Sequence, residues 1–389
     1  MVAVSLIHLQ YATAKELAAD GTLRSISSET LESYGKAIGK LRRYIDNHSA
    51  SASPSVTTVL ICCALFVCFD LMRGKHEEAL GHIESGSAVI SANRHRQRSG
   101  DSPEYAGIVN VFLCLDLQAT MYDDHRKPTL CLAPEQDQQA SLSDSVKSKS
   151  FHSIEEAQVS LLTLIHRALA FVVREAPYGS GRLNVVPGHV TRVRNHLLDL
   201  FEDWAVALAR YAAPTDDHAR SVIAVMMIQH TVMRLLVICA PGTANAGHCF
   251  DTHAQGVLQL ARTIVERRNT SLVGVRRSFA VDIGIVPPLA LLALKTTDSA
   301  IRREAIDIVA QMQRMEGWYE AQSVAKMLQE LEQREDLVRI DSQDLVSAAV
   351  QRVAAAPLVG LEYRAVKIME GYRGDAVGIG KLQDVGGAH

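Results

Sequence analysis

The chain is poor in the residues that interrupt helices. Glycine supplies 24 and proline 11 of its 389 residues, and aromatic side chains make up only 5%. So few chain-breaking residues argue against a turn-rich all-β fold and leave room for long helices.

A strong net charge is also missing. The chain carries 40 Lys and Arg against 43 Asp and Glu, a net charge of −3, which gives no global electrostatic reason to bind nucleic acid. At 48% hydrophobic residues it is too apolar to be disordered. Its length suits two to three domains of about 150 residues each, or one continuous helical body.

Signals for secretion and membrane insertion are absent. The seven cysteines are odd in number and irregularly spaced, which argues against a secreted disulfide framework. The N-terminus has no basic segment of the kind that begins a signal peptide. The most apolar run, Val56 to Phe69, is shorter than the ~18–20 residues of a membrane span and predicts a buried core helix. We therefore expect an intracellular protein without a membrane segment.

Enzyme signatures are missing too. The sequence contains no G-x-S-x-G, Walker A, H-E-x-x-H or G-x-G-x-x-G motif. His82-Ile83-Glu84 matches the start of a zinc deaminase motif, but no Pro-Cys-x-x-Cys follows it. The sequence thus indicates no enzyme: it nominates no catalytic residue, no cofactor and no metal ligand set.

What the sequence does contain is helical periodicity, which predicts an all-α fold: a large irregular array of stacked helical hairpins without a sheet. Apolar residues from Ile301 to Met315 form one helical stripe, with Asp298 or Ser299 as N-cap and Gly317 as the stop. Ser153 to Glu156 is a capping box that starts another helix. Further helices are expected around Ala205–Tyr211, Val222–Cys239 and Val257–Val265.

A polar segment divides the chain. Residues 135–150 are rich in Ser and Gln and free of aromatics, and the tail after residue 370 is rich in glycine. We predict an N-terminal helical part over 1–130, a linker over 131–153, a C-terminal helical part over 154–370 and a disordered tail over 371–389.

One cluster has ligand-like chemistry. His248, Cys249, Asp251 and His253 are all residue types that bind zinc. The competing interpretation is a loop leading into a helix, with Asp251 or Thr252 as its N-cap, and we favour it because adjacent residues point apart.

Basic residues form only small groups. The densest is Arg94-His95-Arg96-Gln97-Arg98, followed by Arg262, Arg267, Arg268, Arg276 and Arg277. Such groups can serve as a nuclear-import patch or a phosphate contact, but solvated helix ends have the same composition and are the more common case.

Four ordered blocks resemble the regulatory region of fungal-specific transcription regulators of the zinc binuclear-cluster (Zn₂Cys₆) class. The first is the helix Tyr34 to Leu41, and the second runs from Leu60 to Ile90, with Phe69, Asp70, Gly74, Ala79, His82 and Gly86 at matching positions. The third is Phe151 to Ala157. The fourth runs from Ile283 to Trp318 and includes Pro287-Pro288 and Glu316-Gly317-Trp318. It departs from the family at Thr296-Thr297, where Cys-Arg is usual.

The resemblance implies an all-helical regulatory and dimerising module located in the nucleus. The family binds DNA through six cysteines that begin as C-x₂-C-x₆-C and hold two zinc ions. No such spacing occurs here, so the resemblance implies a regulator that acts through protein partners, as a homodimer or as a heterodimer with related regulators, without binding DNA directly. Whether the zinc cluster was lost or is encoded upstream stays open.

Two other interpretations compete with the transcription regulator. One is an α-helical interaction scaffold unrelated to transcription, and the other is an enzyme with an unrecognised helical active site. The order of the four blocks favours the regulator over the scaffold, and the missing catalytic motifs disfavour the enzyme.

Overall fold

The computed structural model describes most of the chain. The described residues are 1–14, 23, 25–49, 55–94, 102–122, 126, 128–130, 150–175, 188–211, 216–239, 246–271 and 277–341. The predicted linker, except for residues 150–153, and the predicted tail lie outside them.

Within these ranges the protein is predominantly helical, which confirms the all-α prediction. The helices are α1 (Val2–Thr13), α2 (Ser28–Ser49), α3 (Val56–Met72), α4 (His76–Arg94), α5 (Pro103–Tyr122), α7 (Ile154–Glu175), α8 (Gly188–Arg210), α9 (Asp217–Cys239), α10 (Ala246–Ser271), α11 (Val286–Lys295), α12 (Ser299–Ala310) and α13 (Ala321–Asp341). Three short strands complete the described part: β1 (Ser278–Ala280), β2 (Arg314–Glu316) and β3 (Tyr319–Glu320).

The helix starts follow the capping signals of the sequence. Ser153 accepts a hydrogen bond from the N–H of Glu156 at 3.1 Å, and the Glu156 carboxylate accepts one from the N–H of His152 at 2.7 Å. Asp298 caps α12 by accepting from the N–H groups of Ala300 and Ile301. These contacts satisfy backbone donors that the first helical turn leaves without an internal partner.

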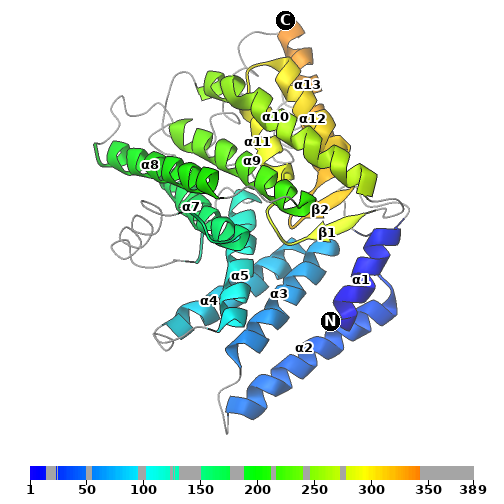
Figure 1. Cartoon of the computed structure of the whole chain (residues 1–389). Helices are drawn as coiled ribbons and strands as arrows, with labels where there is room; N and C mark the ends of the chain where they lie inside the picture. Colours follow the sequence, from blue (N-terminus) through cyan, green and yellow to red (C-terminus); the bar gives the residue numbers. More distant parts are fainter. Residues whose placement is uncertain are drawn as a thin grey trace, which may run out of the picture.

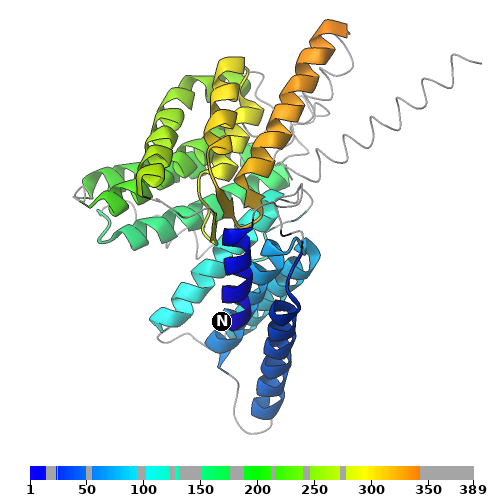
Figure 2. The ribbon, with the colours of Figure 1, turned by 90° about the vertical axis from the view of Figure 1, so that its right-hand side faces the viewer.

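The helices form two parts that meet at the small sheet (Figures 1 and 2). In the first part α3 and α4 form a hairpin, α1 packs on α2 and α3, and α5 packs on α3 and α4. In the second part α9 packs on α7, α8 and α10, while α12 packs on α10, α11 and α13. The contact of α5 with α7 joins the two parts.

The hairpins of the first part depend on two glycines of the second resemblance block. Gly74 has φ of 69° and ends α3, a left-handed conformation that glycine adopts without steric cost. At Gly86 a Cβ atom would lie 2.0 Å from the Phe112 ring, so only glycine lets α4 and α5 approach this closely.

A three-stranded sheet is present where none was expected. β1 pairs with β2 in parallel, and β2 pairs with β3 in antiparallel orientation. Gly317, with φ of 59°, is in the turn between β2 and β3 and donates its N–H to the Ala280 carbonyl at 2.9 Å. The predicted helix over 301–315 therefore ends at Ala310, and Glu316 to Trp318 form a strand end and turn instead of a helix C-cap. The apolar stripe misled the prediction because Met315, 1% exposed, is buried equally well from a strand.

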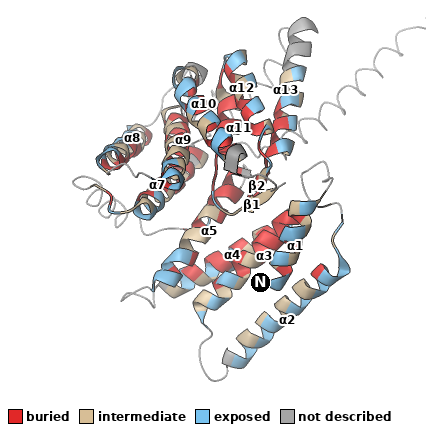
Figure 3. Cartoon of the chain, turned by 45° about the vertical axis from the view of Figure 1, so that its right-hand side comes forward, coloured by how far each residue is buried: buried red, intermediate tan, exposed pale blue. Residues whose placement is uncertain are grey.

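The core runs between the helices of both parts (Figure 3). Val67, Phe69 and Leu71 of α3 are fully buried, but Ile61 is 43% exposed, so the core helix predicted from the apolar run is buried over its second half and partly exposed over its first. Among the described residues, two helices could cross a membrane by length and composition alone. They are the span Ile154–Val173 and α9, and 50% and 44% of their apolar windows are buried inside the protein. Core helices of this kind have the same composition as membrane spans.

Candidate functional site

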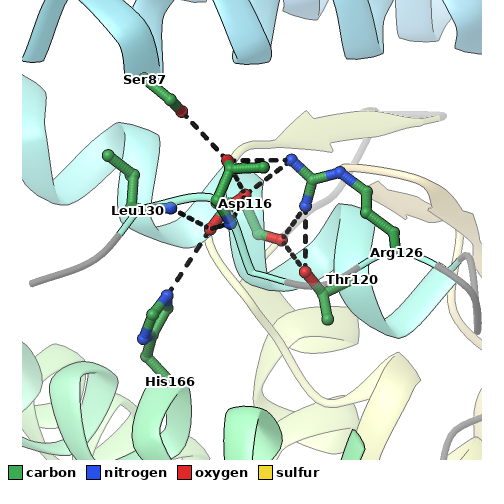
Figure 4. Close-up of polar contacts among 7 residues, drawn as sticks. Ser87, Asp116, Thr120, Arg126, Leu130 and His166 are labelled. Atoms are coloured by element: carbon green, nitrogen blue, oxygen red, sulfur yellow. Dashed lines mark hydrogen bonds and ion pairs between the residues drawn. The ribbon is translucent and has the colours of Figure 1, made fainter. Parts of the chain in front are cut away.

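The most elaborate polar site surrounds Asp116, a fully buried carboxylate in the middle of α5 (Figure 4). It accepts hydrogen bonds from the backbone N–H of Thr129 at 2.9 Å, from the Thr129 hydroxyl at 2.7 Å and from the N–H of Leu130 at 3.1 Å. The Arg126 guanidinium lies 2.6 Å from Oδ1, and Nε2 of His166 in α7 lies 3.6 Å from Oδ2. Asp116 thereby fastens the segment after α5 to its own helix and lies against α7.

Arg126 is fixed at the same point by further contacts. Its Nη1 donates to the Asp116 carbonyl and to the Thr120 hydroxyl, both at 3.0 Å. The Thr129 hydroxyl lies 3.4 Å from the Ser87 hydroxyl of α4, which brings a third helix to the site. The charge of Arg126 compensates that of Asp116, as a buried carboxylate requires.

These contacts determine the protonation state of the carboxyl group. Burial by itself raises the pKa of Asp116, but the His166 ring, the Arg126 charge and the hydrogen bonds from Thr129 and Leu130 outweigh it and hold the pKa far below its usual range. Asp116 is therefore an ionised acceptor whose oxygens are occupied by the protein's own donors. Such a group anchors structure and is a poor general base, because a base needs a free lone pair that faces a substrate.

A second polar cluster joins α2, α3 and α4. The Tyr34 hydroxyl donates to Oδ2 of the buried Asp70 at 2.9 Å and lies 3.4 Å from Nε2 of His82. The Tyr34 ring stacks on Phe69 with centroids 4.1 Å apart, and Arg73 lies over both rings. Burial, followed by the neighbouring Asp70 charge, raises the pKa of Tyr34 well above its usual value. The phenol therefore stays protonated and acts as a hydrogen-bond donor.

A third buried carboxylate, Glu316, lies in β2 and connects the sheet to α11. Its Oε2 accepts the Val286 N–H at the start of α11 at 2.9 Å, and Nε of Arg314 lies 3.2 Å from Oε1. Burial raises the pKa of Glu316, against the opposing effect of Arg314. At Gly284 a Cβ atom would lie 1.9 Å from Oε1, so the glycine of the fourth block makes room for this carboxylate.

We predicted that His248, Cys249, Asp251 and His253 form a loop and helix cap. In the structure Asp251 and His253 have separate contacts. Asp251 lies inside α10, which begins at Ala246, so the prediction of an N-cap at Asp251 or Thr252 is wrong. Asp251 instead accepts hydrogen bonds from the hydroxyls of Thr296 and Thr297 and from the Thr297 N–H, because the loop after α11 brings those donors to its side. His253 is exposed and bonds the Cys249 carbonyl at 3.1 Å, while the His248 side chain lies outside the described residues. Among the residues that the structure describes, no group of three or more His, Cys, Asp or Glu could hold a metal ion.

The arginines that form small basic groups in the sequence do not form one basic surface among the residues that the structure describes. The side chain of Arg94 and residues 95–98 lie outside the described part, as does Arg276. Arg262 pairs with Glu304, and Arg277 donates to the Ala14 carbonyl. Arg267 and Arg268 line a cavity together with residues of α7 and α9.

Sequence reasoning missed the Asp116 site. Its partners lie ten to fifty residues away, at separations that match no motif. One signal was available, since Asp116 is an isolated charge in the apolar run Val111 to Leu117, and a charge in such a position requires a buried partner.

No family model, curated protein or solved structure matches this chain. Its function is therefore inferred from its own residues and their geometry.

Proposed function

We propose that this chain is a transcription regulator of the fungal Zn₂Cys₆ type. In this proposal it supplies the helical regulatory and dimerising region, carries no zinc-cluster sequence and acts in the nucleus through partner proteins. The sequence contains no C-x₂-C-x₆-C spacing with which to read DNA.

One observation carries the proposal: blocks that resemble the family separately in sequence contact one another in space. Tyr34 of the first block stacks on Phe69 and bonds Asp70 of the second block. His82, which is twelve residues after Asp70, returns to the same cluster across the α3–α4 hairpin, 3.4 Å from the Asp70 carboxylate. The residues that carry the first two blocks therefore support one joint between α2, α3 and α4, as the proposal expects.

The third and fourth blocks also lie at joints. Ala157 of the third block accepts a hydrogen bond from the buried Trp204 indole of α8 at 3.1 Å, and Phe151 packs on the same ring. In the fourth block Glu316 holds the start of α11, as described above. The residues that carry the resemblance thus stabilise the helix arrangement, as expected for a regulatory region that acts by its folded shape and not by catalysis.

A partner surface is available on the first helices. Met1, Val2 and Leu9 of the α1 region are 80%, 68% and 60% exposed, and Leu31 of α2 is 42% exposed. Contiguous exposed apolar surface is typical of protein-interaction sites, and in this proposal a partner covers the exposed side chains of α1 and α2.

A tethering experiment tests the proposal. The full chain is fused to a heterologous DNA-binding domain in a fungal host, and expression of a reporter behind the matching DNA site is measured. We expect a several-fold change relative to the DNA-binding domain alone, and we expect the unfused chain to accumulate in the nucleus. A fusion that carries Asp199→Asn, at an exposed position on α8, should change reporter expression as much as the unaltered fusion does.

Reporter expression equal to that of the DNA-binding domain alone, together with exclusion from the nucleus, would contradict the proposal and favour a scaffold unrelated to transcription. A second measurement concerns DNA. The purified chain should carry no stoichiometric zinc and should select no DNA sequence at about 0.15 M salt. A base-specific footprint of the purified chain would overturn the dependence on partners.

A further inference from the structure

A large cavity opens between the two parts of the protein. Its volume is about 1130 Å³, and it is lined by residues of α5, α7, α9 and α10 and by residues on either side of the sheet. Figure 1 shows α9 and α10 beside β1 and β2, whose residues Ser278 and Arg314 also line the cavity. Pockets that hold drug-sized ligands typically measure about 300–1,000 Å³, so this cavity has room for a small organic molecule.

The lining of the cavity includes aliphatic side chains from three helices: Val111, Val159, Leu162, Val222, Val225 and Met226. Several of these side chains are only half-buried although all are aliphatic. An apolar ligand body would remove this surface from water, which is favourable in proportion to the area covered.

The lining of the cavity also includes half-buried arginines. Two of them are Arg268 of α10 and Arg314 of β2. The nearby carboxylate Glu316 is paired with Arg314, with 3.2 Å between Nε and Oε1. A single carboxylate cannot neutralise two guanidinium groups. Consistent with this, Nη1 of Arg268 is buried and has no hydrogen-bond acceptor among the residues that the structure describes.

The acidic residues of the lining, Glu155, Asp217 and Asp282, are exposed. Water therefore screens their charges, and Asp217 is paired with Arg220 at 2.6 Å. Burial lowers the pKa of Arg268, which marks its charge as incompletely compensated. The half-buried charges of the lining are therefore positive, and aliphatic side chains line the same cavity.

We propose that the cavity binds a small amphipathic anion, with an acidic head group on the Arg268 guanidinium and an apolar body against the valine, leucine and methionine side chains of the lining. A guanidinium presents paired N–H donors that match the oxygens of a carboxylate or a phosphate. The site stands on the cavity alone and holds whether or not the chain regulates transcription.

The test uses three probes with the same apolar body: decanoate, decyl phosphate and the neutral 1-decanol. Binding to the full chain is measured by isothermal titration calorimetry. We expect saturable binding of at least one anionic probe, at least about tenfold tighter than that of 1-decanol, because a hydrogen bond to a charged group contributes at this scale. Comparing the affinities of decanoate and decyl phosphate then identifies which acidic head group the site prefers. Equal affinity for all three probes, or no saturable binding of either anion, would overturn the proposal.

Variants test the charged and the apolar part of the site separately. Arg268→Met keeps an apolar stem and should remove the preference for the anions, about tenfold, while leaving 1-decanol unaffected. Arg192→Met, at an exposed arginine on α8, is its control. Val159→Trp should fill the cavity from an exposed position and weaken all three probes, whereas Val206→Trp, equally exposed on α8, should not. If Arg268→Met fails to fold, the Val159→Trp pair still decides: unchanged binding in Val159→Trp would place the probes outside the cavity and refute the site.

Discussion

Replacing Asp116 by asparagine keeps the shape of the side chain but removes its charge, and we expect it to destabilise the protein strongly. The asparagine NH₂ must occupy the place of one carboxylate oxygen. At the Oδ2 position it faces two N–H donors, those of Thr129 and Leu130, at 2.9 and 3.1 Å. At the Oδ1 position it faces the Arg126 guanidinium at 2.6 Å. Either orientation leaves buried donors without an acceptor.

The magnitude follows from these contacts. A buried donor left without an acceptor costs about 1–3 kcal/mol, and breaking a buried ion pair from one side costs about 3–5 kcal/mol. We therefore expect Asp116→Asn to lower the free energy of unfolding by about 3–5 kcal/mol near neutral pH. Urea denaturation followed by circular dichroism measures it, and Asp199→Asn, an exposed control on α8, should change it by less than about 0.5 kcal/mol.

The pH dependence gives an independent check. Because the folded pKa of Asp116 lies far below its ordinary value of about 3.9, the stabilisation is complete above that value and is lost as the pH falls through the folded pKa. The free energy of unfolding of the wild type exceeds that of Asp116→Asn at pH 7, and this excess should shrink by about 1 kcal/mol between about pH 7 and pH 3. A cost below about 1 kcal/mol at pH 7, or a difference that does not shrink in acid, would refute the role of Asp116 as a charged anchor.

Three further expectations concern other joints of the fold. Gly317→Ala should cost more than about 2 kcal/mol, because φ is positive there and a Cβ atom would overlap the side chain of a neighbouring helix; Gly256→Ala, with open space around it, should be neutral or stabilising in the same denaturation assay. Tyr34→Phe keeps the ring stack and loses one hydrogen bond, so a loss of about 1 kcal/mol is expected, and an unchanged urea midpoint would contradict it. Burial raises the pKa of Cys68 to about 12, so this thiol should resist iodoacetamide at neutral pH in peptide mapping, and its rapid labelling would contradict that burial.

The sequence predicted the fold best where a local rule determines it. Ser153 and Asp298 cap helices because a hydroxyl or a carboxylate meets backbone N–H groups two or three residues away, and no distant residue takes part. Pro287 and Pro288 lie in the first turn of α11, as expected for a residue that has no N–H to donate there.

The sequence did not predict the role of a residue where a partner distant in the chain determines that role. Asp251 has the right residue type and setting for an N-cap, but the threonines after α11 take its carboxylate and α10 begins five residues earlier. Gly317 has the left-handed conformation expected of a helix stop, yet it lies in a turn between strands because β1, far back in the chain, pairs with β2. Asp116 was missed for the same reason, since no spacing rule links it to His166.

Two buried glutamines have a consequence for the synthesis of the protein. The side-chain amide of Gln118 in α5 donates to the Val281 carbonyl, and that of Gln229 in α9 donates to the Ile283 carbonyl. Gln118 and its partner are 163 residues apart, so at about 5–20 residues per second the ribosome needs roughly 8–33 seconds to deliver the second after the first. During that interval the nascent N-terminal helices cannot complete their core. A chaperone that shields the unfinished face of α5 would therefore matter most for this chain before residue 281 has left the ribosome.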